Sequence, residues 1–282
     1  MKELRYFYDP EASLSEGAPG RLEGDEASHA VRVLRLGKGD DLNIIDGRGH
    51  LIQATVTATT KHDCDYIINK VETHPPLWPC PVIIGVAPTK NIDRLEWFVE
   101  KATEIGVDRI VLLNCQYSER RVVNTDRLDR IAVAAMKQSH KFYKPVISNI
   151  TDFGEYIQSE ELASPQSLKF IAHCYDDADL TVPCNPPLED KENPLQSKPF
   201  LLDVLSSSLT PLREDSGSLL SRRPGEDIVS LQVLIGPEGD FSTSEVRQAI
   251  SRGYLPVSLG ESRLRTETAA LVAVHLMQLA QR

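Results

Sequence analysis

Positive charge is in short supply in this sequence. The 282 residues include 31 Lys and Arg against 41 Asp and Glu, which gives a formal net charge of −10. That balance excludes a histone-like protein that binds nucleic acid through bulk positive charge, although it does not exclude a local basic surface. The chain is long enough for about two domains, each with a core of its own.

Cysteine pairs and long apolar runs are missing as well. The five cysteines, at positions 64, 80, 115, 174 and 184, form no CxxC pair, and their odd number favours reduced thiols. The opening segment, MKELRYFYDP, lacks the apolar stretch of a signal peptide, and no window approaches 18 uninterrupted apolar residues. We therefore expect a cytoplasmic protein with no membrane partner.

Several nucleotide and metal signatures are also absent. The sequence has no GxxxxGK phosphate-binding motif, and no GxGxxG follows its first apolar strand, so neither a P-loop NTPase nor a dinucleotide site is indicated. The seven histidines show no HExxH or other paired spacing. We expect no metal.

The N-terminal part consists of short β-favouring segments separated by turns. Such segments occur at 4–8, 41–46, 51–58 and 64–72, and one helical stretch begins near Asp25. This pattern predicts a small β-barrel with one helix over residues 1–74. The linker predicted at 75–81 contains four prolines, which keep it extended.

From residue 82 onward, apolar strands alternate with long helices. The strands are predicted at 82–88, 109–115, 167–175, 231–237 and 254–260, and the helices at 91–105, 125–142, 242–252 and 265–281. The alternation indicates an α/β domain with a mainly parallel sheet over 82–282. Residues 183–225 interrupt it with seven prolines and seven serines, and we predict there a mostly disordered insertion, in which 200–209 could form a short ordered segment.

Two loops in the C-terminal half carry most of the functional information. In LIGPEGDFSTSEV at 234–246, a buried strand leads into Gly236-Pro237-Glu238-Gly239, and Ser242 or Thr243 caps the next helix with Glu245 in its first turn. Glycines at the carboxyl end of a parallel strand let backbone approach a flat ligand. An ordinary strand-to-helix turn is the alternative interpretation.

The second loop, LGESRLRTETA at 259–269, places Arg263 and Arg265 before an almost wholly apolar helix. Thr266 or Thr268 is a candidate cap, and Glu267 lies where the helix dipole favours an acid. A helix that is apolar on nearly every face is buried, so its polar start is a candidate site. The alternative is a capped core helix with solvated arginines.

Positive charge is concentrated in one segment, residues 120–144. Against only two aspartates, it contains Arg120, Arg121, Arg127, Arg130, Lys137, Lys141 and Lys144. Such a segment is a candidate surface for phosphate contacts, and a solvated helix surface is its alternative explanation.

Taken together and in this order, these segments resemble the RsmE family, the N3-uridine methyltransferases of 16S ribosomal RNA in the SPOUT (trefoil-knot) superfamily. The resemblance covers nearly the whole chain apart from the insertion. It is carried by RYF at 5–7, VLRLGKGD at 33–40, RLEWFVEKATEIGV at 94–107, SER at 118–120, IGPEG at 235–239 and LGESRLRTETA at 259–269.

The resemblance implies an N-terminal PUA-like RNA-binding barrel, a trefoil-knot methyltransferase domain and a homodimer that acts on 16S ribosomal RNA or the small ribosomal subunit. It also implies S-adenosyl-L-methionine as cofactor. The residues expected to bind this cofactor, several of them through backbone groups, are Ala172, His173, Leu234, Ile235, Gly236, Glu238, Gly239, Leu259, Gly260, Leu264, Arg265 and Thr268.

Methylation of uracil N3 removes a proton and develops negative charge on the ring oxygens. We therefore expect Arg265 to stabilise that charge and Glu267 to act as a base or orienting acid. The residues expected to position RNA are Arg5, Arg32, Arg35, Ser118, Arg120, Arg121 and Lys141.

Two positions depart from the family pattern. Asp240 stands where family members often have a second glycine, and His140-Lys141 stands where they often have Gly-Arg. The overall prediction is methylation of uridine N3 in small-subunit ribosomal RNA. Two alternatives stay open: a SPOUT methyltransferase with another RNA target, such as a ribose 2′-hydroxyl, and a non-catalytic RNA-binding knot protein.

Overall fold

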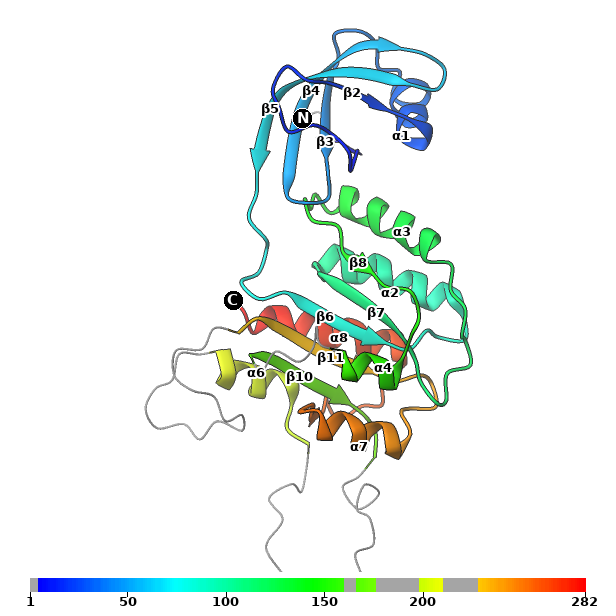
Figure 1. Cartoon of the computed structure of the whole chain (residues 1–282), viewed down its shortest axis with the longest axis vertical. Coiled ribbons are helices and arrows are strands. Elements are labelled where there is room, and N and C mark those ends of the chain that lie inside the picture. The colour runs from blue at the N-terminus through cyan, green and yellow to red at the C-terminus, as the bar shows by residue number, and fades with distance from the viewer. Residues whose placement is uncertain (1–4, 160–165, 176–197, 210–227) are drawn as a thin grey trace, which may run out of the picture. The chain divides into compact units, whose positions relative to one another are not determined.

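A computed structural model describes residues 5–159, 166–175, 198–209 and 228–282 (Figure 1). The chain divides into two compact units. The first unit combines Met1–Leu77 with Asp129–Pro145, and the second combines Trp78–Leu128 with Val146–Arg282. A segment from the middle of the sequence therefore belongs with the N-terminal unit.

The first unit is built on a five-stranded sheet in the order β1-β3-β4-β5-β2. Its strands are β1 (Tyr6–Tyr8), β2 (Pro19–Leu22), β3 (Asp41–Ile45), β4 (His50–Thr59) and β5 (Cys64–Thr73). β3, β4 and β5 are antiparallel neighbours, whereas β1 runs parallel to β3. Alternate residues of β4, namely Ile52, Ala54 and Val56, are buried, as the period of a half-buried strand requires.

A short helical stretch accompanies this sheet. It consists of α1 (Gly24–Ser28) followed directly by η1 (His29–Val33), one turn of π-helix. The sequence predicted a helix capped by Asp25, but the N-cap residue is Glu23 and it makes no side-chain hydrogen bond. Ala27 and Ala30 are fully buried against the sheet residues of the same core, so the stretch is held by packing.

The second unit contains a seven-stranded sheet in the order β12-β10-β11-β6-β7-β8, with β9 paired to β7. Every strand pairing described in it is parallel. The strands are β6 (Val82–Val86), β7 (Arg109–Asn114), β8 (Val146–Ile147), β9 (Thr151–Asp152), β10 (Ser167–Ala172), β11 (Ser230–Ile235) and β12 (Leu255–Val257). The predicted α/β architecture with a mainly parallel sheet is confirmed.

Helices of this unit pack beside the sheet (Figure 1). They are α2 (Ile92–Ile105), α4 (Phe153–Gln158), α6 (Leu201–Leu209), α7 (Thr243–Ser251) and α8 (Thr266–Leu279), while α3 (Thr125–Gln138) spans the division between the units. α8 packs against α2, α6, β6 and β11. None of the helices in the described part of the chain has the length and apolar character needed to span a membrane.

The helix ends follow local sequence closely in two cases. The Asn91 side chain accepts a hydrogen bond from the Asp93 amide at the start of α2, and Gly106 ends that helix at φ 117°. Ser242 and Glu245 form a complete capping box at α7. The cap expected from Thr266 or Thr268 is wrong, because the N-cap of α8 is Arg265, whose side chain makes no capping bond.

The insertion predicted at 183–225 lies mostly outside the described residues. Its described part contains α6, in which Leu201, Val204 and Leu205 are buried. The short segment that the sequence left open as ordered, 200–209, contains α6, and this helix packs against α8. Phe200 also forms a parallel bridge with Ser258 next to β12.

Candidate functional site

A cavity lies where three adjacent parallel strands end. Its volume is about 600 Å³, and it is lined by the segments that follow β10, β11 and β12. Cavities of this size at the carboxyl edge of a parallel sheet hold small ligands. We call it the main cavity. Nine of the twelve residues predicted to bind a cofactor line it: Ala172, His173, Ile235, Gly236, Glu238, Leu259, Gly260, Leu264 and Arg265.

The other three residues predicted to bind the cofactor are not among the lining residues of the main cavity. Leu234 points into the core, where its side chain is fully buried beside Gly85. Gly239 faces Tyr117, since a β-carbon there would lie 3.3 Å from Tyr117 Cβ. Thr268 lines a second, smaller cavity.

The loop between β11 and α7 folds tightly over the end of the sheet. A β-carbon on Gly236 would lie 2.9 Å from the backbone nitrogen of Phe241, so only glycine fits there without a shift of the backbone. Asp240 has φ 68°, and its carboxylate accepts hydrogen bonds from the amides of Cys174 at 2.8 Å and Phe241 at 2.7 Å. Asp240 thereby joins the loops that follow β10 and β11.

Sequence reasoning missed several residues of the main cavity, above all Lys198. The Lys198 ammonium donates to the carbonyl oxygens of His173 at 2.5 Å and Tyr175 at 2.8 Å. Because Lys198 belongs to the predicted insertion, it stood in no motif, and only its tertiary contact with the loop after β10 reveals it. Arg94, Asp240 and Arg263 are further lining residues that were not predicted.

The start of α8 forms the wall of a second cavity of about 290 Å³. Its lining residues are Asp93, Arg94, Trp97, Arg265, Glu267 and Thr268, and Arg94 and Arg265 line the main cavity too. The two residues predicted as catalytic are therefore placed differently: Arg265 borders both cavities, whereas Glu267 borders only the second one.

Glu267 is the least satisfied carboxylate of this region. It is 8% exposed, and its Oε1 lies 3.8 Å from Arg94 Nε. Its Oε2 has no hydrogen-bond partner among the described residues. A buried carboxylate oxygen without a donor is unfavourable unless a ligand supplies one.

The residues predicted to contact RNA fall in both units. Arg5, Arg32, Arg35 and Lys141 belong to the first unit, and Ser118, Arg120 and Arg121 to the second. Arg32, Arg35 and Arg121 are exposed, and burial lowers the pKa of the half-buried Lys141.

Two of the residues predicted to contact RNA brace the protein's own loops. The hydroxyl of Ser118 is buried and accepts from the Cys115 amide at 3.0 Å. Arg120 donates to the carbonyl oxygens of Thr89 at 3.0 Å and Lys90 at 2.6 Å. The Lys90 amide in turn donates to Glu238 at 2.8 Å, so Arg120 supports a loop that contacts the main cavity.

Much of the positive charge of segment 120–144 is neutralised within the protein. Arg127 pairs with Glu96 at 2.6 Å, Lys144 pairs with Asp129 at 2.7 Å, and Lys137 pairs with Glu26. In the described part of the chain, Arg121, Arg130 and Lys141 make no salt bridge. The net charge of the segment therefore overstates what it offers to a phosphate backbone.

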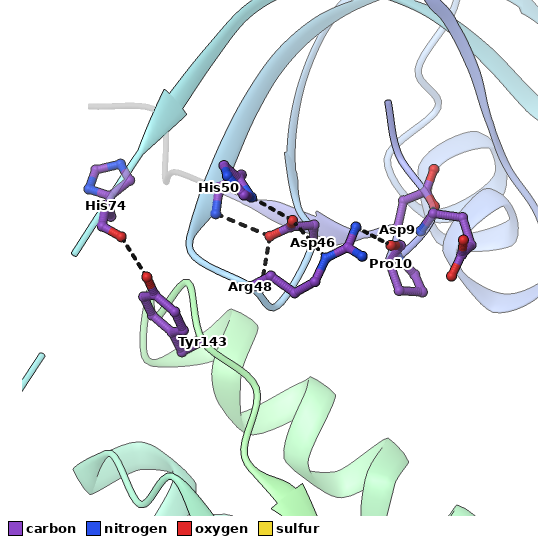
Figure 2. A network of polar contacts seen from close by, with 8 residues as sticks. Asp9, Pro10, Asp46, Arg48, His50, His74 and Tyr143 are labelled. Carbon is purple, nitrogen blue, oxygen red and sulfur yellow. Dashed lines mark hydrogen bonds and ion pairs between the residues drawn. The ribbon is translucent and has the colours of Figure 1, made fainter. Parts of the chain in front are cut away.

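A buried aspartate organises a turn of the first unit (Figure 2). The Asp46 carboxylate accepts from the amides of Arg48 at 2.8 Å and His50 at 3.1 Å, and from their side chains at 3.2 Å and 2.7 Å. Arg48 also donates to the Pro10 carbonyl at 2.7 Å. Burial alone raises the pKa of Asp46, but the hydrogen bonds from Arg48 and His50 outweigh it and lower that pKa.

The same turn is joined to the middle segment that belongs to the first unit. The Gly49 amide donates to Phe142 O at 2.9 Å, the Lys144 amide donates to the Gly47 carbonyl at 2.9 Å, and the Tyr143 hydroxyl donates to the His74 carbonyl at 2.8 Å (Figure 2). These bonds explain why Asp129–Pro145 groups with the N-terminal sheet.

No cluster of three metal-ligating side chains occurs among the residues that the structure describes.

Two family models match different parts of the chain. Residues 76–195 and 207–278 match the model of an RNA methyltransferase domain, and residues 22–68 match an RNA methyltransferase PUA domain. The chain is 25% identical over 281 residues to the ribosomal RNA small subunit methyltransferase E of Rickettsia conorii, covering 99% of this chain and 96% of that protein.

Solved structures with the same fold are also found. A probable rRNA-methyltransferase from Porphyromonas gingivalis is 36% identical, with a TM-score of 0.76 and coverage of 99% of this chain and 98% of that one. The ribosomal RNA small subunit methyltransferase E from Neisseria gonorrhoeae, solved bound to S-adenosyl methionine, is 23% identical, with a TM-score of 0.71 and 98% of both chains covered. The predicted fold class, a SPOUT trefoil-knot domain with a PUA-like N-terminal domain, is confirmed.

Proposed function

This chain belongs to the RNA methyltransferase family that includes the ribosomal RNA small subunit methyltransferases E, and from this premise we propose that it methylates N3 of a uridine in small-subunit (16S) ribosomal RNA. S-adenosyl-L-methionine is the methyl donor of this proposal. The observation that carries it is the main cavity, which lies where family resemblance places the cofactor and is lined by nine of the twelve residues expected there.

The residues of the main cavity suit this donor. A cavity of about 600 Å³ accommodates a ligand of that size. Backbone groups around Gly236 and Gly260 are accessible to an adenine and its ribose, and the carboxylates of Glu238, Asp240 and Glu261 complement a sulfonium cation. When bound, S-adenosylmethionine supplies an electrophilic methyl group on a positively charged sulfur.

The chain's own residues handle the charge and the proton of the target base. Arg265, at the border of both cavities, stabilises negative charge on a ring oxygen. Glu267 Oε2, which has no donor among the described residues, accepts the imino proton of N3. Both roles are proposals from chemistry and position.

The remaining parts of the proposal concern partners and location. The N-terminal residues 1–74 would bind RNA, supported by their match to an RNA methyltransferase PUA domain and by the exposed Arg32 and Arg35. The family resemblance supports a homodimer, which sedimentation of the purified protein would test. Ribosomal RNA as substrate supports a cytoplasmic location.

The experiment that tests the target is reverse transcription across small-subunit ribosomal RNA from cells with and without the gene. A methyl group on N3 blocks Watson–Crick pairing and stops the polymerase, so one stop should disappear with the gene and return with a plasmid copy. If every stop persists in the deletion strain, the uridine assignment is wrong. A lost 2′-O-methylation would instead support another RNA target.

Calorimetry separates an enzyme from a non-catalytic RNA-binding protein. We expect the wild type to bind S-adenosylmethionine and Gly236→Ala to bind it at least about tenfold more weakly, since the added carbon displaces the backbone of Phe241. If Gly236→Ala bound S-adenosylmethionine with unchanged affinity, the cofactor would not contact this loop. No binding by the wild type would favour the non-catalytic alternative.

A further inference from the structure

The second cavity presents a set of groups that the methyl donor does not use. Only Arg94 and Arg265 line both cavities, so a molecule in one lies next to a molecule in the other. Its volume of about 290 Å³ is half that of the main cavity, and its lining includes one exposed aromatic ring, that of Trp97. A flat ring of modest size suits such a space.

The charged groups that line this cavity are two carboxylates, Asp93 and Glu267, and two guanidinium groups, Arg94 and Arg265. Glu267 is buried, and one of its carboxylate oxygens has no hydrogen-bond donor in the described part of the protein. The other oxygen lies 3.8 Å from Arg94 Nε, too far for a good hydrogen bond. With Arg94 and Arg265 in the lining beside Glu267, the cavity offers an acceptor and two cationic donors.

We propose that this second cavity holds the target uracil, with Trp97 as the stacking surface and Glu267, Arg94 and Arg265 as the groups that read its edge. The proposal rests on the function proposed above and extends it to base recognition. Along its pairing edge, uracil presents the acceptor O2, the donor N3–H and the acceptor O4. Guanidinium donors for the two ring oxygens and a carboxylate acceptor for N3–H are the complement of that pattern.

The same arrangement rejects cytosine. Cytosine presents a lone pair at N3 and an amino group at C4, so its N3 would face the Glu267 carboxylate and its amino group would face a guanidinium. Either mismatch leaves buried polar groups unpaired. The Watson–Crick edge is read only when the nucleotide is unpaired or turned out of a helix, which stacking on Trp97 would favour.

The two tryptophans of the chain, Trp78 and Trp97, allow a direct test. In a Trp78→Phe background, Trp97 is the sole tryptophan and reports stacking through quenching of its fluorescence. The full-length protein with S-adenosylhomocysteine bound is titrated with uridine 5′-monophosphate and, separately, with cytidine 5′-monophosphate. We expect saturable quenching that is at least about fivefold tighter for the uridine nucleotide.

Two variants separate recognition from a structural role. Glu267→Gln, whose amide can donate to the N3 of cytosine, should reduce the preference for uridine to less than about twofold while leaving S-adenosylhomocysteine affinity unchanged. Trp97→Phe keeps a ring and should retain methyl transfer to small subunits from cells lacking the gene. Trp97→Ala should raise KM for those subunits by about tenfold or more.

The outcomes distinguish this proposal from the function on which it rests. Equal quenching by both nucleotides, or none, in a protein that binds S-adenosylhomocysteine and methylates subunits would overturn the uracil assignment alone. Failure to bind S-adenosylhomocysteine or to methylate subunits would overturn the proposed function itself. A preference for uridine that survives Glu267→Gln unchanged would show that Glu267 does not read the base.

Discussion

Asp46 and Glu267 are two buried carboxylates, each beside an arginine, in different units of the molecule. Asp46 accepts four hydrogen bonds from Arg48 and His50, whereas Glu267 has one oxygen 3.8 Å from Arg94 Nε and another without a donor among the described residues. Burying a charge without partners is costly, so the protein tolerates it where a ligand completes the contacts. The satisfied carboxylate builds structure, and we expect the unsatisfied one to belong to a ligand site.

The two carboxylates also differ in where their neighbours come from. The donors to Asp46 lie two and four positions later in the chain, so one turn supplies them all. Arg94, the charged residue nearest to Glu267, lies on α2, far away in sequence, and reaches it because α2 packs against α8. A local network such as that of Asp46 can form from one short sequence motif. The surroundings of Glu267 form only when the whole domain has folded.

The largest expected effect comes from Glu267→Gln. The amide keeps the size of the side chain but cannot take a proton, so methyl transfer at saturating substrates should fall by at least about a hundredfold. Since Glu267 makes no close hydrogen bond among the described residues, the melting temperature should change little. Single-turnover transfer of labelled methyl to subunits from cells lacking the gene measures the first effect, and thermal unfolding measures the second.

The matched control for Glu267→Gln is Asp46→Asn, which makes the same change of charge at the other buried carboxylate. If Glu267→Gln lost as much stability as Asp46→Asn, or kept more than half of its activity, the contrast between the two carboxylates would be wrong.

Asp46→Asn should show the opposite result. An amide cannot accept all four N–H groups, and its own amino group faces donors, so the free energy of unfolding should fall by about 2 kcal/mol. Affinity for S-adenosylmethionine should remain unchanged, because the main cavity belongs to the second unit. Hydrogen exchange of the amides of β3 and β4 locates the loss, and calorimetry tests the affinity.

Unchanged exchange in β3 and β4 would mean that the turn is held without Asp46. His50→Gln offers a milder control, since it removes one of the four hydrogen bonds and leaves the charge of the carboxylate in place.

The contribution of Asp46 should depend on pH in a definite direction. Its folded pKa is lowered, so its stabilising effect is complete above the unfolded pKa of about 3.9 and is lost as pH falls through the folded value. The stability difference between wild type and Asp46→Asn should therefore be constant near neutrality and shrink in acid. Denaturant unfolding of both proteins over that range measures it, and a constant difference down to the lowest accessible pH would contradict the assignment.

Sequence predicted what short-range chemistry determines. Ser242 was one of two residues predicted to cap α7 with Glu245 in its first turn, and these residues, three positions apart, form the capping box. The strands and helices around the main cavity were predicted from the local pattern of apolar residues. What the sequence left open or missed depends on contacts distant in sequence: α6 packs on α8, and Trp97 and Lys198 line their cavities only in the folded chain.

The two departures from the family pattern have a common structural reason. Asp240 has φ 68° and His140 has φ 57°, in the left-handed region that glycine occupies without strain. A family glycine at either position is therefore explained by backbone conformation. This chain keeps the conformation with other residues and must compensate for it.

Asp240 is a third carboxylate, which accepts fewer hydrogen bonds than Asp46 and more than Glu267. Substitutions of Asp240 should give the smallest effect. Its hydrogen bonds to the amides of Cys174 and Phe241 link two loops of the main cavity. Asp240→Asn loses one of the two acceptor oxygens but can still accept from the Cys174 amide and link the loops, and asparagine tolerates positive φ, so its affinity for S-adenosylmethionine should fall by no more than about twofold. Asp240→Gly relieves the backbone but loses the link between the loops, and a drop of about threefold is expected.

Asp240→Ala separates the two contributions, because it loses the link between the loops and keeps a β-carbon in the left-handed region. That conformation costs about 1 kcal/mol, so alanine should bind S-adenosylmethionine about fivefold more weakly than glycine at this position. Calorimetry on the three variants should therefore rank them Asn, Gly, Ala in falling affinity. Equal affinity of the Gly and Ala variants would mean that the loop relaxes out of positive φ. Weaker binding by the Gly variant than by the Ala variant would mean that a mobile loop reduces the binding free energy more than a strained loop does.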